Sequence, residues 1–148
     1  MKKEDVPQHR GLFGQRRAVC YALDSDGEYV LTPTAGWDPA NLANRQAWEA
    51  IAEELTEILH RVQAGELSPL AYHMARNQMT AGMLAKYVRI FRWRVRRHLR
   101  PEIFSRLDAA TLQRYAEVLR ISVEELQRVP DELDLEMPEI DEIEDSEA

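Results

Sequence analysis

Two short helical patterns separated by three residues lie in AGMLAKYVRIFRWRVRRHLRP, residues 81–101. The first pattern, AGMLAKYV, can be capped by Thr80, and its apolar residues recur at helical spacing. Four of its residues are expected to point inward: Met83, Leu84, Tyr87 and Val88. The second pattern, RWRVRRHL, ends before Pro101, because the residue that precedes a proline disfavours helical backbone. The stretch therefore predicts two short helices joined by a tight turn.

Seven of the 19 basic residues of the chain lie in the same stretch. Residues 86–100 contain seven basic side chains and no acidic one: Lys86, Arg89, Arg92, Arg94, Arg96, Arg97 and Arg100. From Pro130 to Ala148 there are ten acidic residues and no basic residue, which accounts for the formal net charge of −7. Residues 1–129 have 16 acidic and 19 basic residues, a net charge of +3. A helix rich in guanidinium groups suits a polyanionic partner.

The N-terminal region contains a candidate β-hairpin. Residues 1–16 are polar and lack a clear period, so we expect a flexible arm. The runs AVCYALD and EYVLTPT follow, on either side of the turn signal Asp26-Gly27. A lone hairpin is marginally stable in water, so it is expected to pack on another element.

A long amphipathic helix is predicted next, over residues 44–64. Its apolar residues share one face: Trp48, Ile51, Ala52, Leu55, Ile58, Leu59 and Val62. Four acidic residues lie outside that face: Glu49, Glu53, Glu54 and Glu57. Asp38 or Asn44 is expected to cap the helix, and Gly65 is expected to follow its end.

Two tryptophans flank the start of this helix. Trp37 and Trp48 are expected to anchor the hairpin to the helix, and they are also a candidate surface for a protein partner. The predicted fold is mainly α: a hairpin plus long helix over residues 17–66, followed by a helical domain over 67–129.

The helical domain is predicted to contain five helices, and the chain then ends in an acidic tail. The expected helices are 69–79 after Ser68, 81–88, 92–99, 109–119 after Asp108, and 123–129. Ser122 and Glu125 have the spacing of a capping box. Residues 130–148 alternate acidic and apolar side chains, and we expect them to be disordered in isolation.

Residues 70–129 resemble the lambda-repressor-like (Xre/Cro type) helix-turn-helix superfamily. Leu84-Ala85 begins the family's pattern, Val88 and Ile90 form its apolar pair, and Val95 is the central valine of its recognition helix. RYAEVLRISVEEL, residues 114–126, resembles the family's closing helices. The resemblance covers about 60 of the 148 residues and implies a DNA-binding regulator.

The resemblance also implies roles for individual residues. Six would pack the two helices together: Leu84, Ala85, Val88, Ile90, Val95 and Leu99. Four would contact base edges in the major groove: Arg92, Trp93, Arg96 and Arg97. Four more would contact phosphates: Lys86, Arg89, Arg94 and Arg100.

Four positions depart from the family's usual residues. Arg89 stands where the family prefers Gly in the turn, and Phe91 stands where it prefers a capping Ser. Each change is expected to cost roughly 1 kcal/mol. Arg120 lies where Gly is frequent, and His98 lies where an apolar residue is common. The turn is therefore expected to be divergent.

The sequence contains no pattern that predicts catalysis or a cofactor. It has no glycine-rich phosphate loop, no GxSxG, and no paired carboxylates in an apolar setting. The histidines His60, His73 and His98 lack metal-ligand spacing, so no metal site is predicted. The single cysteine, Cys20, cannot form an internal disulfide, and no run is apolar enough to span a membrane. We therefore expect a cytoplasmic protein that is not an enzyme.

Two functional hypotheses follow. The first is a transcriptional regulator that binds double-stranded DNA. The resembled family usually binds as a dimer, so the hairpin and the long helix are a candidate homodimer contact or a candidate ligand-sensing surface. The second is an adaptor that holds a protein partner through the helix-turn-helix surface or the N-terminal region, with little or no DNA binding. In either case the acidic tail is a candidate competitor for the arginines.

Overall fold

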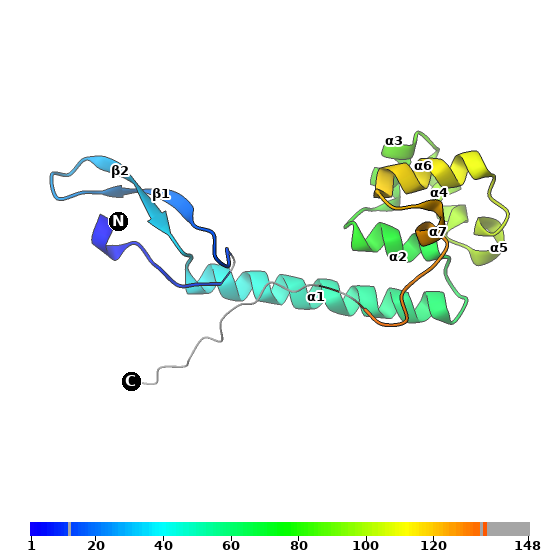
Figure 1. Ribbon diagram of the computed structural model, residues 1–148, viewed down its shortest axis with the longest axis horizontal. Helices are drawn as coiled ribbons and strands as arrows, with labels where there is room; N and C mark the ends of the chain where they lie inside the picture. The colour runs from blue at the N-terminus through cyan, green and yellow to red at the C-terminus, as the bar shows by residue number, and fades with distance from the viewer. Residues whose placement is uncertain (12, 134, 136–148) are drawn as a thin grey trace. The chain divides into compact units, whose positions relative to one another are not determined.

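The computed structural model describes residues 1–11, 13–133 and 135, and this part of the chain is mainly helical with one antiparallel hairpin (Figure 1). These features confirm the predicted mainly α class. The predicted disorder of the tail concerns residues that lie largely outside the described ones. The described residues divide into two compact units within the longest helix: residues 1–50 and 135 belong to one unit, and residues 51–133 belong to the other.

The first unit contains the predicted hairpin, with strands β1 (Ala18–Leu23) and β2 (Tyr29–Thr34). The two strands pair antiparallel over their full length. Gly27 lies in the connecting turn with φ of 79°, a backbone conformation that glycine adopts without steric cost.

The N-terminal segment lies against this hairpin and does not form the expected flexible arm. It begins with a 3₁₀ turn, η1 (Lys3–Asp5), and Val6 is buried. The Leu23 N–H donates to the Met1 carbonyl at 3.0 Å, and Gln8 Nε2 donates to the Pro33 carbonyl at 2.8 Å. The spacing of apolar residues did not predict this segment's structure, because its hydrogen bonds join residues far apart in the sequence.

The first unit also contains the start of the long helix α1 (Asp38–Gln63), which begins at Asp38, the earlier of the two candidate starts, and not at Asn44. Asp38 is its first residue, and its carboxylate pairs with His9 Nδ1 at 2.8 Å. The four glutamates expected on the solvent side of α1 are exposed, as predicted. Gly65 follows the helix with φ of 76°, also as predicted.

The two tryptophans do not form the expected anchor between hairpin and helix. Trp37 is exposed, and Trp48 is only half-buried. The fully buried apolar residues of α1 are instead Leu55, Leu59 and Val62, which belong to the second unit. The hairpin was predicted to pack on the long helix, but the N-terminal segment packs on it.

The second unit is formed by the end of α1 and six shorter helices, all within the described residues. They are α2 (Pro69–Arg76), α3 (Ala81–Val88), α4 (Arg92–His98), α5 (Pro101–Phe104), α6 (Ala109–Leu119) and α7 (Val123–Leu126). The predicted α2 and α7 were longer, and α5 was not predicted. Pro101 does end α4, but it also occupies the first turn of α5, where its missing N–H has no cost.

Predicted side-chain caps begin three of these six helices. The Thr80 hydroxyl accepts from the Met83 N–H, the Asp108 carboxylate accepts from the Thr111 N–H, and Ser122 with Glu125 forms a capping box. Ser68 has the N-cap position of α2, but its hydroxyl donates to the His98 carbonyl at 2.8 Å. This buried hydrogen bond ties the start of α2 to the end of α4.

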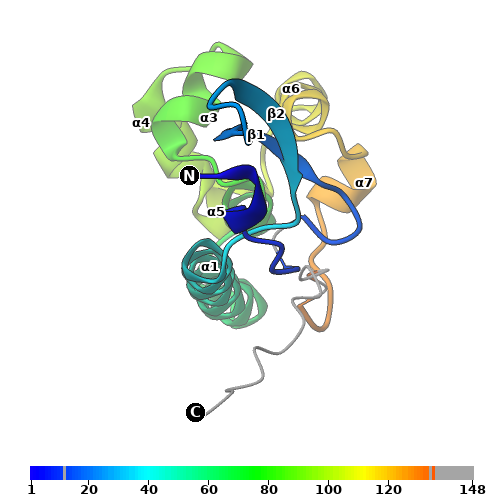
Figure 2. The same cartoon turned by 90° about the vertical axis from the view of Figure 1, so that its left-hand side faces the viewer.

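A shared apolar core joins these helices. It contains buried side chains from α2, α3, α4, α5, α6 and α7. Helix α3 packs against α4 and α6, and α7 contacts α2 and α6. Figure 2 shows α3 and α4 side by side. The core thus holds α3 and α4 as a pair.

Candidate nucleic-acid interface

The connection between α3 and α4 is three residues long and has the departures expected from the sequence. Arg89 adopts the left-handed conformation, with φ of 55° and ψ of 44°. Phe91 occupies the N-cap position of α4 without a side-chain cap hydrogen bond. The Ile90 N–H donates to the Ala85 carbonyl at 3.1 Å, which closes the end of α3. Arg120 is left-handed as well, with φ of 57°.

The residues expected to pack α3 against α4 lie in the core. Leu84 and Val95 are 0% exposed, and Ala85 and Val88 are also buried. Ile90 and Leu99 are partly buried and pack against the same cluster. Val95 is the only fully buried apolar residue of α4, so it fixes which face of this helix points to solvent.

The seven basic residues between positions 86 and 100 are all exposed. Among the described residues, none of them lies within ion-pair distance of a carboxylate. The four predicted base-contact residues, Arg92, Trp93, Arg96 and Arg97, are thus exposed, as are the four predicted phosphate-contact residues. An unpaired guanidinium group in water keeps its donors available for an external anion.

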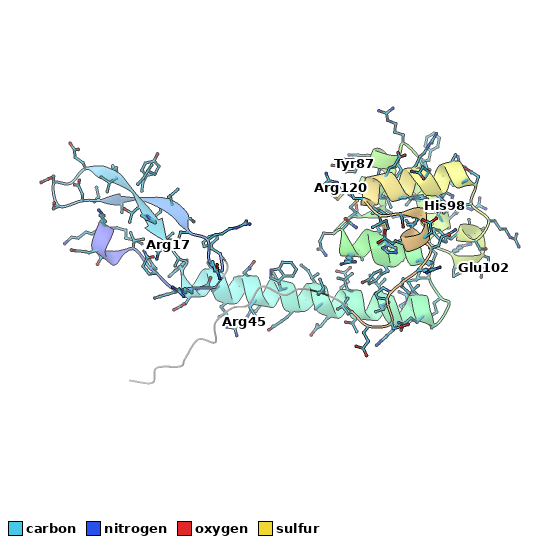
Figure 3. The ribbon with its side chains drawn as sticks, viewed as in Figure 1. Arg17, Arg45, Tyr87, His98, Glu102 and Arg120 are labelled. Carbon is cyan, nitrogen blue, oxygen red and sulfur yellow. The ribbon has the colours of Figure 1, made fainter. Side chains whose placement is uncertain are left out.

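Exposed aromatic side chains lie among these cations, and one of them, Tyr87, was expected in the core. Tyr87 and Met83 were predicted to point inward, but both are exposed. Figure 3 shows Tyr87 at the C-terminal end of α3. The buried face of this eight-residue helix is already formed by Leu84, Ala85 and Val88. Met83 and Tyr87 lie outside that face and point to solvent. Phe91 is 73% exposed and Trp93 is 57% exposed.

A surface pocket of about 410 Å³ borders α4. It is lined by Phe91, Trp93, Arg94, Arg97, His98 and Ile103. The pocket combines two aromatic rings with two guanidinium groups, a chemistry suited to a flat or anionic group of a partner.

His98 anchors α4 from the inside. It is buried, and its Nδ1 lies 2.9 Å from the Tyr115 hydroxyl on α6. Burial lowers the pKa of His98, with a further decrease from Arg94 and Arg97, so its imidazole is neutral near pH 7. Burial also raises the pKa of Tyr115. The sequence pattern missed this pair because the two residues are far apart along the chain.

Comparison with known proteins yields no matching family model, no matching curated protein and no matching solved structure. Within the described part of the chain, no helix has both the length and the apolarity of a membrane span. No group of three or more potential metal ligands occurs in that part either.

Proposed function

We propose that this protein binds double-stranded DNA through α4, as a regulator of the lambda-repressor-like helix-turn-helix type. One observation carries the proposal: seven exposed cations on and beside α4 have no carboxylate partner among the described residues. In this proposal Arg92, Arg96 and Arg97 read base edges, and the flanking cations bind phosphates.

The geometry of α4 supports this proposal. Val95 points into the core, so Arg96 and Arg97, which lie away from this face of the helix, point away from the protein body. Arg92 lies one turn before Val95, and its side chain lies near Gly82 of α3. An α-helix fits the major groove of B-DNA, and arginine can donate two hydrogen bonds to one guanine. The His98 contact with Tyr115 and the Ser68 contact with the His98 carbonyl keep α4 in place. A fixed helix loses less conformational entropy when it binds.

A protein-binding adaptor is the second candidate, because aromatic side chains are exposed on the same surface. Tyr87, Phe91 and Trp93 lie among the arginines. Tyrosine, tryptophan and arginine are the residues most often enriched at the energetic centres of protein interfaces. A protein partner would cover the rings, whereas a DNA groove would mainly engage the guanidinium groups.

Fluorescence anisotropy with mixed-sequence duplexes over a salt series tests DNA binding. Seven phosphate contacts predict that the logarithm of the binding constant falls with the logarithm of salt concentration at a slope of about −6. A signal that does not change with salt would contradict the proposal.

Matched charge variants make the test specific to this surface. The triple variant Arg92→Gln, Arg96→Gln, Arg97→Gln should lower affinity at least about tenfold at low salt. The control triple variant Arg76→Gln, Arg106→Gln, Arg128→Gln removes the same charge from exposed positions outside residues 86–100, and it should stay within about threefold of the parent chain. Equal losses in the two variants would indicate a nonspecific charge effect.

The adaptor candidate requires a different measurement. Native mass spectrometry of the protein purified from its own cells would detect a stoichiometric protein partner. Loss of that partner in Tyr87→Ser and Phe91→Ser, together with salt-insensitive duplex binding, would favour the adaptor.

A further inference from the structure

The β-hairpin has two different faces. Residues alternate between the faces of a strand, so Ala18, Cys20 and Ala22 share one face. On that face Ala22 and Thr32 are buried, and the Thr34 hydroxyl donates to the Pro7 carbonyl. The N-terminal segment therefore covers this side of the hairpin.

The opposite face is apolar and open. It consists of three cross-strand pairs: Val19 with Pro33, Tyr21 with Leu31, and Leu23 with Tyr29. Four of these side chains are between 62% and 75% exposed: Val19, Tyr21, Tyr29 and Leu31. Contiguous exposed apolar side chains of this kind mark interaction sites in soluble proteins. We call these six residues the open hairpin face.

The edges of the hairpin are less suited to a partner than this face. β2 contains Pro33, which has no N–H to extend a sheet. The Gln8 side chain already donates to the Pro33 carbonyl, and Leu23 of β1 is bridged to the N-terminal segment at Lys2. A partner would therefore gain little from backbone pairing and more from covering the open hairpin face.

Charge at the two ends of the hairpin indicates which partner fits. Arg16 and Arg17 are exposed at the open end, where β1 begins. Asp26 and Glu28 are exposed at the turn, and among the described residues neither forms an ion pair. The strands and turn of the hairpin are thus basic at one end, apolar in the middle and acidic at the other end. Lys2, Lys3 and Glu4 of the N-terminal segment also lie beside the turn end.

We propose that a second copy of this chain covers the open hairpin face, in a two-fold dimer whose strands run in opposite directions. Such an arrangement places the turn of each hairpin against the open end of the other, so Asp26 and Glu28 meet Arg16 and Arg17 at both ends. The two-fold axis passes the middle pair, Tyr21 with Leu31, so this pair contacts the same pair of the second copy. This proposal does not depend on DNA binding.

The dimer should depend on concentration. A hairpin with strands of six residues is about 20 Å long and about 10 Å wide, which is less than the roughly 800 Å² per partner of a standard interface. We therefore expect a reversible equilibrium between monomer and dimer.

Sedimentation velocity of the full chain over a concentration series, without nucleic acid, measures this equilibrium. The parent chain should dimerise, and Tyr21→Asp or Leu31→Asp should raise the dimer dissociation constant at least about tenfold. Leu42→Asp, at an exposed position of α1 outside the hairpin, is the matched control and should dimerise like the parent. Far-UV circular dichroism checks that each variant is folded.

Charge reversal distinguishes the antiparallel two-fold arrangement from other contacts. Arg16→Glu with Arg17→Glu makes both ends acidic, and Asp26→Lys with Glu28→Lys makes both ends basic. Each double variant alone should dimerise about three- to tenfold more weakly at low salt, and an equimolar mixture should form heterodimers with about the parent's affinity.

Three results would overturn the proposal. A parent chain that is monomeric at every concentration would remove the dimer. A dimer that survives both Tyr21→Asp and Leu31→Asp would lie elsewhere on the chain. Failure of the mixed charge variants to associate would exclude the antiparallel arrangement.

Discussion

The two units of this protein use apolar side chains in opposite ways. In the helical unit, Leu84, Val88 and Val95 are buried, and the surface around them carries charge. In the hairpin unit, Val19, Tyr21 and Leu31 face solvent. Six short helices can surround a common core, whereas a two-stranded hairpin has no second layer except its N-terminal segment. The comparison indicates that the helical unit presents charge and the hairpin unit presents apolar area.

The sharpest test of this comparison replaces one valine in each unit. Val95→Ala should lower the free energy of unfolding by about 2–3 kcal/mol, because it leaves a cavity in a closed core. Val19→Ala should change it by less than about 0.5 kcal/mol at a concentration where the chain is monomeric, because this side chain already contacts water. Urea denaturation monitored by circular dichroism measures both. Similar losses in the two variants would contradict the comparison.

A second test changes pH, which should affect the helical unit through its buried histidines. Burial lowers the pKa of His73 and His98 from the usual 6.5, so the folded unit prefers neutral imidazoles. Above pH 6.5, neither the folded nor the unfolded chain binds protons at these two histidines. As the pH falls below it, the unfolded chain binds protons that the folded chain does not, and stability decreases until the lowered folded-state pKa is passed. Urea midpoints at about pH 7.5 and about pH 5.5 measure this decrease.

Histidine variants assign the pH effect. His73→Gln should make stability depend less on pH, since it removes one of the two buried groups. His60→Gln is the control, because His60 is exposed on α1 and should leave the dependence unchanged. A pH dependence that is the same in His73→Gln as in the parent would exclude burial of His73 as a cause.

A third test separates stability from binding at the two left-handed arginines. Arg89→Gly and Arg120→Gly should each stabilise the chain by about 0.5–1 kcal/mol, because glycine adopts this conformation without the Cβ clash. Only Arg89→Gly should also weaken duplex binding at low salt, since it removes a proposed phosphate contact. Thermal unfolding and anisotropy measure the two effects. Equal duplex binding by both variants would remove Arg89 from the proposed interface.

The smallest expected effect concerns the acidic tail, most of which lies outside the described residues. Truncation should follow Leu133, because Gln63 Nε2 donates to the carbonyls of Pro130 and Asp131 and these contacts should remain. Removal of the acidic residues beyond that point should tighten duplex binding about threefold at low salt and leave it unchanged at about 0.3 M salt. Unchanged affinity at low salt would indicate that the tail does not compete for the arginines.

Much of the helical unit could be predicted from local sequence. Thr80, Asp108 and the pair Ser122 with Glu125 cap helices where expected, because a cap acts on backbone only two or three residues away. Burial of Leu84 and Val95 followed from helical spacing. The left-handed turn at Arg89 followed from the family resemblance.

Contacts between residues distant in sequence were not predicted. The N-terminal segment was expected to be flexible, yet Gln8 and Thr34 hold it to the hairpin. Met83 and Tyr87 were placed in the core, although the core was already filled by their neighbours. Pairs such as His98 with Tyr115 leave no periodic signal, since neither residue type indicates its partner.

The sequence by itself determined where five of the six short helices of the second unit begin, several of the residues that fill its core and where the positive charge gathers, because these properties depend on spacing, capping and composition. Only the tertiary structure decided that the charge stays unpaired among the described residues, that aromatic rings lie beside it, and that one hairpin face remains open. Those outcomes depend on which segments pack against one another. That choice is made by the whole chain as it buries apolar area and satisfies its backbone hydrogen bonds.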